Sequence, residues 1–245
     1  MNQSSGKLQR MLDAIAPNGE GEDAFFRELL VSTVFAQVPS SDDSGQLRFI
    51  QFISPEGETL LPFFTDQTKA RQAGDGSAKV VEFDGRTFFE LTLGATLVMN
   101  PNDRWCKLYP DEVRVLLDGG TLRPLNKERG AQDEQVELSE TVGTPEDILE
   151  QLQYQMASLG AVDRGYLADI RRTAVGSVPE TALIVLVKKS QTERVCRSLI
   201  AVLQRFPPRP GSPALILPFD PTAGLPDWFE HPSLRLIFQA GQSHD

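Results

Sequence analysis

The stretch PLNKERGAQDEQVELSETVG, residues 124–143, most constrains how this chain can fold. It is polar and charged, and its one alternating apolar piece consists of Val136 and Leu138. A stretch of this kind does not build a core, so we predict that residues 125–143 form a linker that runs into the first strand of a second domain. In a chain of 245 residues, the flanking segments 1–124 and 144–245 each have the size of an independent domain.

Periodic apolar residues predict the elements of the first domain. We expect helices over residues 6–16, over a segment that begins at Asp23 as its N-cap, over 67–73 behind a cap at Thr65 or Asp66, and over 110–118. The segment 87–94 fits a helix or a strand, and we favour the helix because Gly94 would end it well. Strands are expected at STVFAQV, TLLPFF, KVVEF and ATLVM. The segment LRFIQFI, residues 47–53, is apolar on both faces, which favours a central strand.

The second domain is expected to contain strand, strand, helix, strand and strand after its first helix. That first helix, in TPEDILEQLQYQMASLG, has Thr144 at its predicted cap and Pro145 at its first helical position. The predicted fold class is therefore α+β, with two mixed α/β domains. Each would contain a small, mostly antiparallel or mixed sheet flanked by helices.

Charge and composition exclude several classes of function. Residues 1–144 contain 23 acidic and 14 basic side chains, and the remainder contains 11 and 10. An acidic front half repels a phosphate backbone, so we expect no nucleic-acid partner. The longest aliphatic run, ALIVLV, is far too short to cross a membrane. The start of the chain lacks the apolar segment of a signal peptide, and the two cysteines are far apart, so we expect a cytoplasmic protein.

Catalytic motifs are absent from the sequence, and we therefore expect a protein that is not an enzyme. The two histidines, His231 and His244, lie near the end of the chain, which makes a nucleophile–base arrangement hard to assemble. Carboxylate pairs such as Asp42–Asp43 and Asp133–Glu134 leave open a carboxylate-only metal or hydrolase site, which we rank last. We predict no metal and no cofactor.

The stretch LVMNPNDRWCKLYPDEVRVLLDGG, residues 97–120, is the best candidate for a functional loop. Asn-Pro is a turn dipeptide and Tyr-Pro-Asp-Glu is an ordinary helix start, so the segment is first of all a structural corner. As a binding loop it would use an amphipathic Trp and polar residues at strand ends. The candidate binding residues are Asn100, Asn102, Trp105, Thr65 and Asp66.

Three segments together resemble the N-terminal domain of the SseB-like, or enhanced serine sensitivity, proteins. They are FFRELLVSTVFAQVP, LLPFFTDQTKA and the 97–120 stretch, in that order. The part of the chain from about residue 134 looks like the C-terminal domain that accompanies it. The resemblance implies a bacterial, cytoplasmic protein and supplies no established catalytic residue that could be carried over.

Two hypotheses of function remain beside the enzyme. The preferred one is a non-catalytic protein that binds another protein, in a regulatory role. It rests on adjacent aromatic pairs, which either lie sandwiched between two covered faces or leave a ring exposed: Phe25, Phe26, Phe63, Phe64, Phe88 and Phe89. The alternative is a sensor of an amino acid or another small molecule, with a pocket between the domains. The sequence leaves homo-oligomerisation open.

Overall fold

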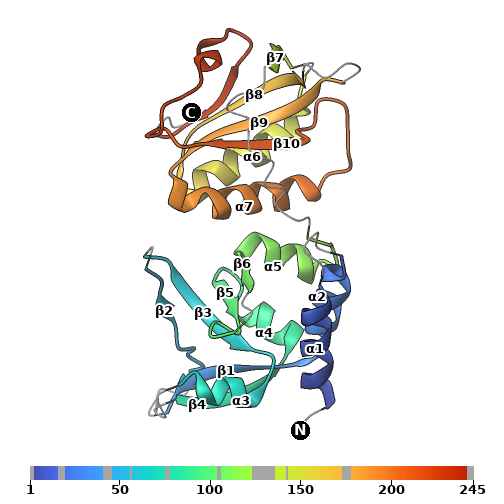
Figure 1. Cartoon of the computed structure of the whole chain (residues 1–245), viewed down its shortest axis with the longest axis vertical. Helices are drawn as coiled ribbons and strands as arrows, with labels where there is room; N and C mark the ends of the chain where they lie inside the picture. Colours follow the sequence, from blue (N-terminus) through green and yellow to red (C-terminus); the bar gives the residue numbers. More distant parts are fainter. Residues whose placement is uncertain are drawn as a thin grey trace. The chain divides into compact units, whose positions relative to one another are not determined.

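The computed structural model divides the chain into two compact units, Met1–Pro124 and Leu125–Asp245. We describe each unit by itself. The structure describes residues 3–15, 20–40, 46–55, 57–74, 78–103, 106–122, 136–141, 143–172 and 178–241. Both units combine helices with a mixed sheet, which confirms the predicted α+β class (Figure 1). None of the helices described is both long enough and apolar enough to cross a membrane.

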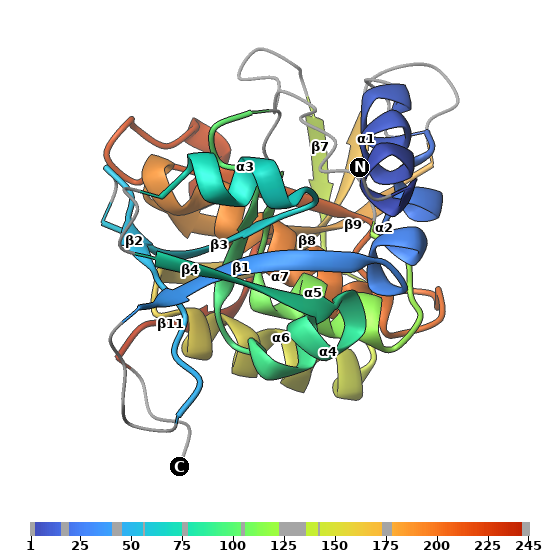
Figure 2. The same cartoon turned by 90° about the horizontal axis from the view of Figure 1, so that it is seen from below.

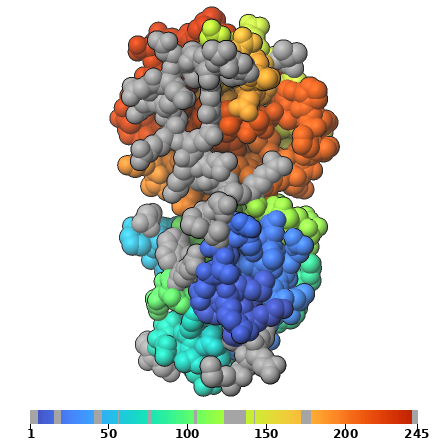
Figure 3. All heavy atoms as spheres, turned by 45° about the vertical axis from the view of Figure 1, so that its right-hand side comes forward, coloured from blue at the N-terminus to red at the C-terminus, as the bar shows by residue number. Residues whose placement is uncertain are grey.

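The first unit alternates helices and short strands. Its helices are α1 (Gln3–Ala14), α2 (Glu22–Leu30), α3 (Gln67–Gln72), α4 (Gly85–Leu91) and α5 (Pro110–Leu117). Its strands are β1 (Thr33–Pro39), β2 (Phe52–Ile53), β3 (Thr59–Phe64), β4 (Ala78–Asp84), β5 (Thr96–Met99) and β6 (Cys106–Leu108). The blue atoms of α1 and α2 lie together on one face of this unit in Figure 3.

The first sheet has six strands in the order β4-β1-β3-β5-β6, and β2 pairs with β3 beside this path. Only the β3–β5 pair is parallel among the pairs described. Strand β3 pairs with β2 at Leu60 and with β1 at Phe63, so Pro62 lies where the partner changes. A proline has no N–H to donate, which suits a position between two ladders.

Helices cover the two faces of this sheet unequally. Figure 2 shows α3 on one side of β1, β3 and β4, and α4 and α5 on the other. On the α4 side the rings form one cluster: Phe88 lies 5.4 Å from Phe63, 5.5 Å from Phe49 and 5.8 Å from Phe83, measured between ring centroids. On the α3 side a smaller buried cluster consists of Phe35, Phe64 and Ala70.

Two predictions for the first unit are wrong. The segment LRFIQFI is not a central strand, because only Phe52 and Ile53 form a strand, and both side chains are exposed. Asp23 is not the cap of α2: Gly21 holds that position with a left-handed φ of 91°, and Asp23 lies in the first turn. In addition, β6 was not predicted; it adds an antiparallel strand to β5 within the expected loop.

The second unit contains two long helices and a sheet of five strands. Its elements are β7 (Val136–Ser139), α6 (Glu146–Leu159), β8 (Val162–Arg172), β9 (Glu180–Val187), α7 (Thr192–Gln204), β10 (Leu215–Phe219) and β11 (Arg235–Gln239). The single turns η1 (Lys189–Gln191) and η2 (Asp227–Glu230) precede α7 and β11. After α6 the predicted order of strand, strand, helix, strand and strand is confirmed.

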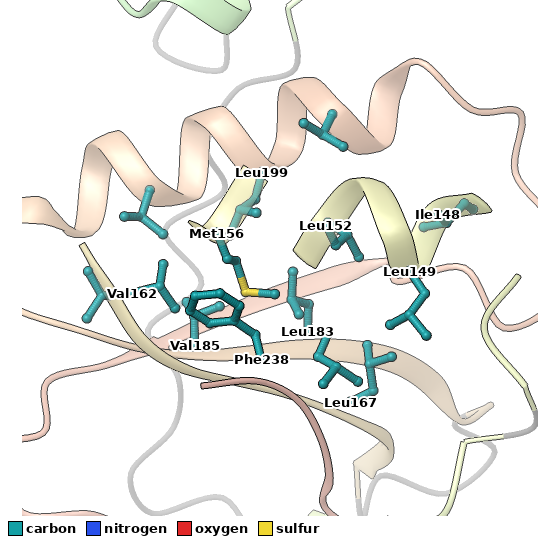
Figure 4. Close-up of a cluster of buried hydrophobic side chains, with 14 residues drawn as sticks. Ile148, Leu149, Leu152, Met156, Val162, Leu167, Leu183, Val185, Leu199 and Phe238 are labelled. Atoms are coloured by element: carbon teal, nitrogen blue, oxygen red, sulfur yellow. The ribbon is translucent and has the colours of Figure 1, made fainter. Parts of the chain in front are cut away.

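The core of the second unit lies between its sheet, ordered β10-β9-β8-β11 with β7 beside β8, and helices α6 and α7. Figure 4 shows Met156 of α6 and Leu199 of α7 directed toward the strands, and Phe238 of β11 directed from its strand toward the helices. Aromatic side chains cover part of the opposite face, where Trp228 stacks on Phe229 at 4.9 Å between ring centroids.

The predicted start of α6 is one residue early. Pro145 is the N-cap and the helix begins at Glu146, while Thr144 lies before it with its Oγ1 unpaired. No side chain caps the helix, but Asp147 in its first turn forms an ion pair with Arg209. Arg209 donates a hydrogen bond to Asp147 Oδ2 at 2.6 Å, which lowers the pKa of that carboxyl. Arg209 belongs to PPRP, which the structure places in a loop.

Candidate functional site

A pocket of about 550 Å³ lies in the first unit, on the face of the sheet that α3 covers incompletely. Its lining is mostly apolar and comes from β1, the β2–β3 hairpin, β5, β6 and the turn after β5. The lining residues are Gln37, Ile50, Phe52, Ser54, Pro55, Leu60, Pro62, Phe64, Ala73, Val98, Pro101, Asn102 and Lys107. We call this the first-unit pocket.

The pocket exists because α3 is only six residues long. Asp66 begins the helix by accepting hydrogen bonds from the backbone N–H groups of Thr68 and Lys69. The helix then packs Ala70 against Phe35 and Phe64 and ends at Gln72. Beyond its end, side chains of β3 and β5 that point to the same face have no helix above them. They form the apolar floor of the pocket.

The β2–β3 hairpin forms one rim of the pocket. Its turn is closed by two backbone hydrogen bonds, from Ser54 N–H to Glu58 O at 2.8 Å and from Gly57 N–H to Ser54 O at 2.9 Å. On β2, the side chain of Phe52 is 39% exposed and that of Ile53 is 72% exposed. Phe52 lines the pocket and Ile53 does not, so β2 exposes an apolar side chain on each of its faces. Exposed apolar side chains next to an apolar pocket indicate a contact site.

The polar side chains that line the pocket differ in whether their charges and hydrogen-bonding groups already have partners within the protein. Lys107 Nζ lies 2.8 Å from Glu58 Oε2, so its charge is balanced locally. Gln37 is 6% exposed, and its Nε2 donates to Ala70 O at 2.7 Å. No described residue donates a hydrogen bond to Gln37 Oε1. This oxygen is therefore an unused acceptor on a side chain that lines the pocket.

The five predicted binding residues have different places in the structure. Asn102 lines the pocket. Asn100 and Thr65 are buried and bind each other, since Thr65 N–H donates to Asn100 Oδ1 at 3.1 Å and Asn100 Nδ2 donates to Thr65 Oγ1 at 3.0 Å. Asp66 is engaged as the cap of α3. Trp105 lies outside the described residues.

The 97–120 stretch contains the structural corner that its turn residues predict. Asn100 has a left-handed φ of 46°, a conformation that Asn tolerates better than most residues. Its N–H donates to Phe63 O at 2.9 Å, and its carbonyl accepts from Asp103 N–H at 3.0 Å. Pro110 then begins α5, and Glu112 Oε2 accepts from Tyr109 N–H at 2.8 Å as part of a capping box.

The aromatic pairs do not form an exposed surface. All six side chains are buried, so these pairs build the core and cannot be the partner surface: Phe25, Phe26, Phe63, Phe64, Phe88 and Phe89. Sequence reasoning missed Gln37, Phe52 and Lys107 as pocket residues. One part of the pocket could have been recognised from the sequence. In LLPFF, apolar residues two positions apart place Leu60, Pro62 and Phe64 on the same face of β3, and this face forms the floor of the pocket.

Neither cysteine forms a disulfide, and Cys106 is half-buried whereas Cys196 is buried, so the two thiols should differ in their rates of chemical labelling. Burial in α7 raises the pKa of Cys196 to about 12, so the unreactive thiol form persists there through neutral and mildly alkaline pH. Because the folded-state pKa is raised, this protection is complete below the ordinary thiol pKa and is lost as the pH rises toward 12. We expect iodoacetamide at pH 8 to modify the half-buried Cys106 well before Cys196, as mapped by peptide mass spectrometry. Equal rates of modification at the two cysteines would contradict the burial of Cys196.

No metal centre accompanies the pocket in the described part of the chain. There, no group of three or more histidine, cysteine, aspartate or glutamate side chains is arranged to hold a metal ion. The described lining residues include no histidine, cysteine or carboxylate side chain. His231 is exposed in the second unit, where its Nδ1 accepts from Ser233 N–H at 3.3 Å.

Fold and pocket together define a two-unit α+β protein with an apolar pocket in its first unit. The model of the SseB protein N-terminal domain matches residues 8–115, and that of the SseB protein C-terminal domain matches residues 131–231. The chain belongs to the SseB family.

Two curated relatives are similar to this chain: Protein SseB of Escherichia coli (strain K12) and Protein SseB of Shigella flexneri. Each is 28% identical over 178 residues, which span 70% of this chain and 69% of the relative. No solved structure matches the chain at a comparable level of significance. The family resemblance drawn from the three sequence segments is thus confirmed.

Proposed function

We propose that this chain is a non-catalytic cytoplasmic protein that binds another protein through the first-unit pocket and the adjoining β2–β3 hairpin. The observation that carries the proposal is the exposed apolar strand β2, whose Phe52 lines an apolar pocket and whose Ile53 is exposed beside it in the sequence. Exposed apolar side chains that border a concave site are typical of protein contact surfaces. The buried aromatic pairs no longer contribute to this argument.

Other features support the non-catalytic and cytoplasmic parts of the proposal. Nucleophilic or general acid–base chemistry needs titratable groups in mutual contact, and the described lining of the pocket includes only one, Lys107, already paired with Glu58. The absence of a disulfide at Cys106 and Cys196 accords with a reducing compartment.

A charge placed on the hairpin tests the proposal. We expect Phe52→Glu to reduce at least tenfold the amount of a stoichiometric partner that co-purifies with the tagged chain from its own host, because an unpaired carboxylate is costly to bury in an apolar contact. The matched control is Leu225→Glu in the second unit, since Leu225 is 40% exposed and Phe52 39%. The captured protein is identified and quantified by mass spectrometry.

Two results would overturn the proposal. One is a chain that purifies without any stoichiometric partner under mild conditions. The other is a partner that is retained equally by the wild-type chain, by Phe52→Glu and by Leu225→Glu, which would place the contact elsewhere. Circular dichroism of both variants verifies that the fold is unchanged.

Small-molecule binding is a second candidate, favoured by the volume of the pocket. At about 550 Å³ the pocket falls within the range of ligand sites. A ligand that binds only the folded chain raises its melting temperature by mass action. Stabilisation by one amino acid at millimolar concentration, lost in Phe52→Glu, would favour this candidate over a protein partner.

A further inference from the structure

We infer that the partner presents an extended segment, which pairs with the free edge of β2 and inserts an uncharged aromatic side chain with a hydrogen-bond donor, tryptophan or tyrosine, into the first-unit pocket. This inference rests on the proposed function and specifies the chemistry of the partner. Three observations carry it: a free strand edge whose exposed side chains are apolar, an electrically balanced apolar pocket, and the unused acceptor of Gln37.

The edge of β2 differs from the edges of β4, β10 and β11. Strand β2 pairs with β3 on one side, and no described strand pairs with its other side. Proteins usually protect such edges with charge, proline or a bulge. Accordingly β4 carries exposed Lys79 and Glu82, β10 contains Pro218, and β11 has an irregular register between Leu236 and Phe238. Strand β2 is short, but its exposed side chains are only apolar.

Pairing along β2 would also complete a strand that the sequence itself favours. The segment before β2 runs next to β1, because Ile50 N–H donates to Gln37 O at 2.9 Å. The residues of 47–53 are apolar on both faces, and of these only Phe52 and Ile53 pair within the sheet. A partner strand would supply hydrogen bonds for the free backbone groups, as in recognition by strand addition.

The pocket beside this edge fits a neutral side chain. The one charged residue among its described lining is Lys107, and Glu58 already balances it. A charged side chain inserted here would therefore lose its hydration without gaining an unpaired counter-charge. The apolar floor of Leu60, Pro62 and Val98 instead suits a large ring.

Gln37 distinguishes among neutral rings. Its Nε2 is committed to Ala70 O, which fixes the orientation of the amide, and its Oε1 receives no hydrogen bond from a described residue. An indole N–H or a phenol O–H supplies the missing donor, whereas phenylalanine and leucine have none. An acceptor left unpaired on binding costs affinity, so the pocket should prefer tryptophan or tyrosine over phenylalanine.

The test uses a defined probe, the fluorescein-labelled peptide Val-Thr-Trp-Thr-Val with a blocked C-terminus, and measures fluorescence polarisation on the full-length chain. We expect saturable binding below about 1 mM, the range of a weak single-anchor contact. Replacing Trp with Phe in the probe should weaken binding about fivefold, the value of one neutral hydrogen bond. In the Gln37→Met variant the Trp and Phe probes should bind with equal affinity. Binding of the Phe probe to this variant verifies that the pocket itself is intact.

Backbone pairing is tested with N-methylated probes. Successive N–H groups of a strand point to opposite edges, so only every second N–H of the probe can face β2. Methylating the N–H groups that face β2 should abolish binding, and methylating those that face away should not. If both methylated probes bind like the parent, the pocket takes a side chain without strand addition, and the inference is wrong. Equal affinity of the Trp and Phe probes for the wild-type chain would overturn the role given to Gln37.

Failure of this inference is distinguishable from failure of the proposed function. A host partner lost in Phe52→Glu, together with no saturable probe binding up to about 1 mM, would overturn the extended aromatic segment and leave the protein contact standing. If the tagged chain captures only untagged copies of itself through the hairpin, the occupant is a second copy, and a foreign segment is excluded.

Discussion

Replacing Phe88 with alanine should lower the free energy of unfolding of the first unit by about 3–5 kcal/mol, the usual cost of deleting a fully buried phenylalanine ring. The ring is completely buried and has four aromatic neighbours, at centroid distances of 5.4–6.2 Å: Phe49, Phe63, Phe83 and Phe89. Its removal leaves a cavity between α4 and the sheet, because surrounding rings collapse only partly.

Amide hydrogen exchange, followed by mass spectrometry of peptides, measures this effect unit by unit. We expect faster exchange in peptides from β3, β4 and α4 of the first unit. Peptides from the core strands β8 and β9 of the second unit provide an internal reference. Phe52→Ala is the matched control, since Phe52 is partly exposed and its loss should cost much less. Similar losses in the two variants would contradict the central position of Phe88.

Introducing a single methyl group at Gly85 should also destabilise the first unit. A Cβ at this residue would lie 2.1 Å from the carbonyl oxygen of Leu29, which belongs to the backbone of α2. Gly85 N–H in turn donates to Ser32 O at 2.9 Å, so the start of α4 and the end of α2 are held together. We expect Gly85→Ala to cost about 3 kcal/mol, the upper part of the usual range for overpacking.

Gly6 is the control for this substitution, because it lies in helix α1 and nothing is within 4 Å of the Cβ that alanine would add. Gly6→Ala should leave stability unchanged or raise it by about 0.5–1 kcal/mol, as expected for glycine in a helix. Urea unfolding monitored by circular dichroism, with hydrogen exchange at α2 and α4, compares the two variants. A neutral Gly85→Ala would show that α2 and α4 separate easily, contrary to the close packing observed.

Local signals in the sequence predict much of the first unit correctly. Asp66 before a helical stretch and Pro110 at the start of α5 act through hydrogen bonds and dihedral limits within a few residues. Asn100 before a proline predicts the turn after β5 for the same reason. Such signals do not depend on distant parts of the chain, and they can therefore be recognised from the sequence without a structure.

Predictions that depended on distant neighbours fared worse. The apolar residues of LRFIQFI predicted a central strand, yet β1 pairs with β3 at Phe63 and Phe64, and only Phe52 and Ile53 of this segment pair with the start of β3. Paired aromatic residues were compatible with either a core or an exposed surface, and the structure buries them all. Of the predicted binding residues, Asn102 lines the pocket, and Asn100 and Thr65 instead satisfy each other.

By itself, the sequence determined the α+β class, most helices and strands, and the family, since periodicity and the order of motifs are properties of the chain alone. Tertiary structure decided where the candidate site lies. The pocket forms because a helix of six residues covers part of a sheet face whose strands come from distant segments. Which side chains remain uncovered depends on the lengths and crossing of those elements, and no short segment of the sequence contains that information.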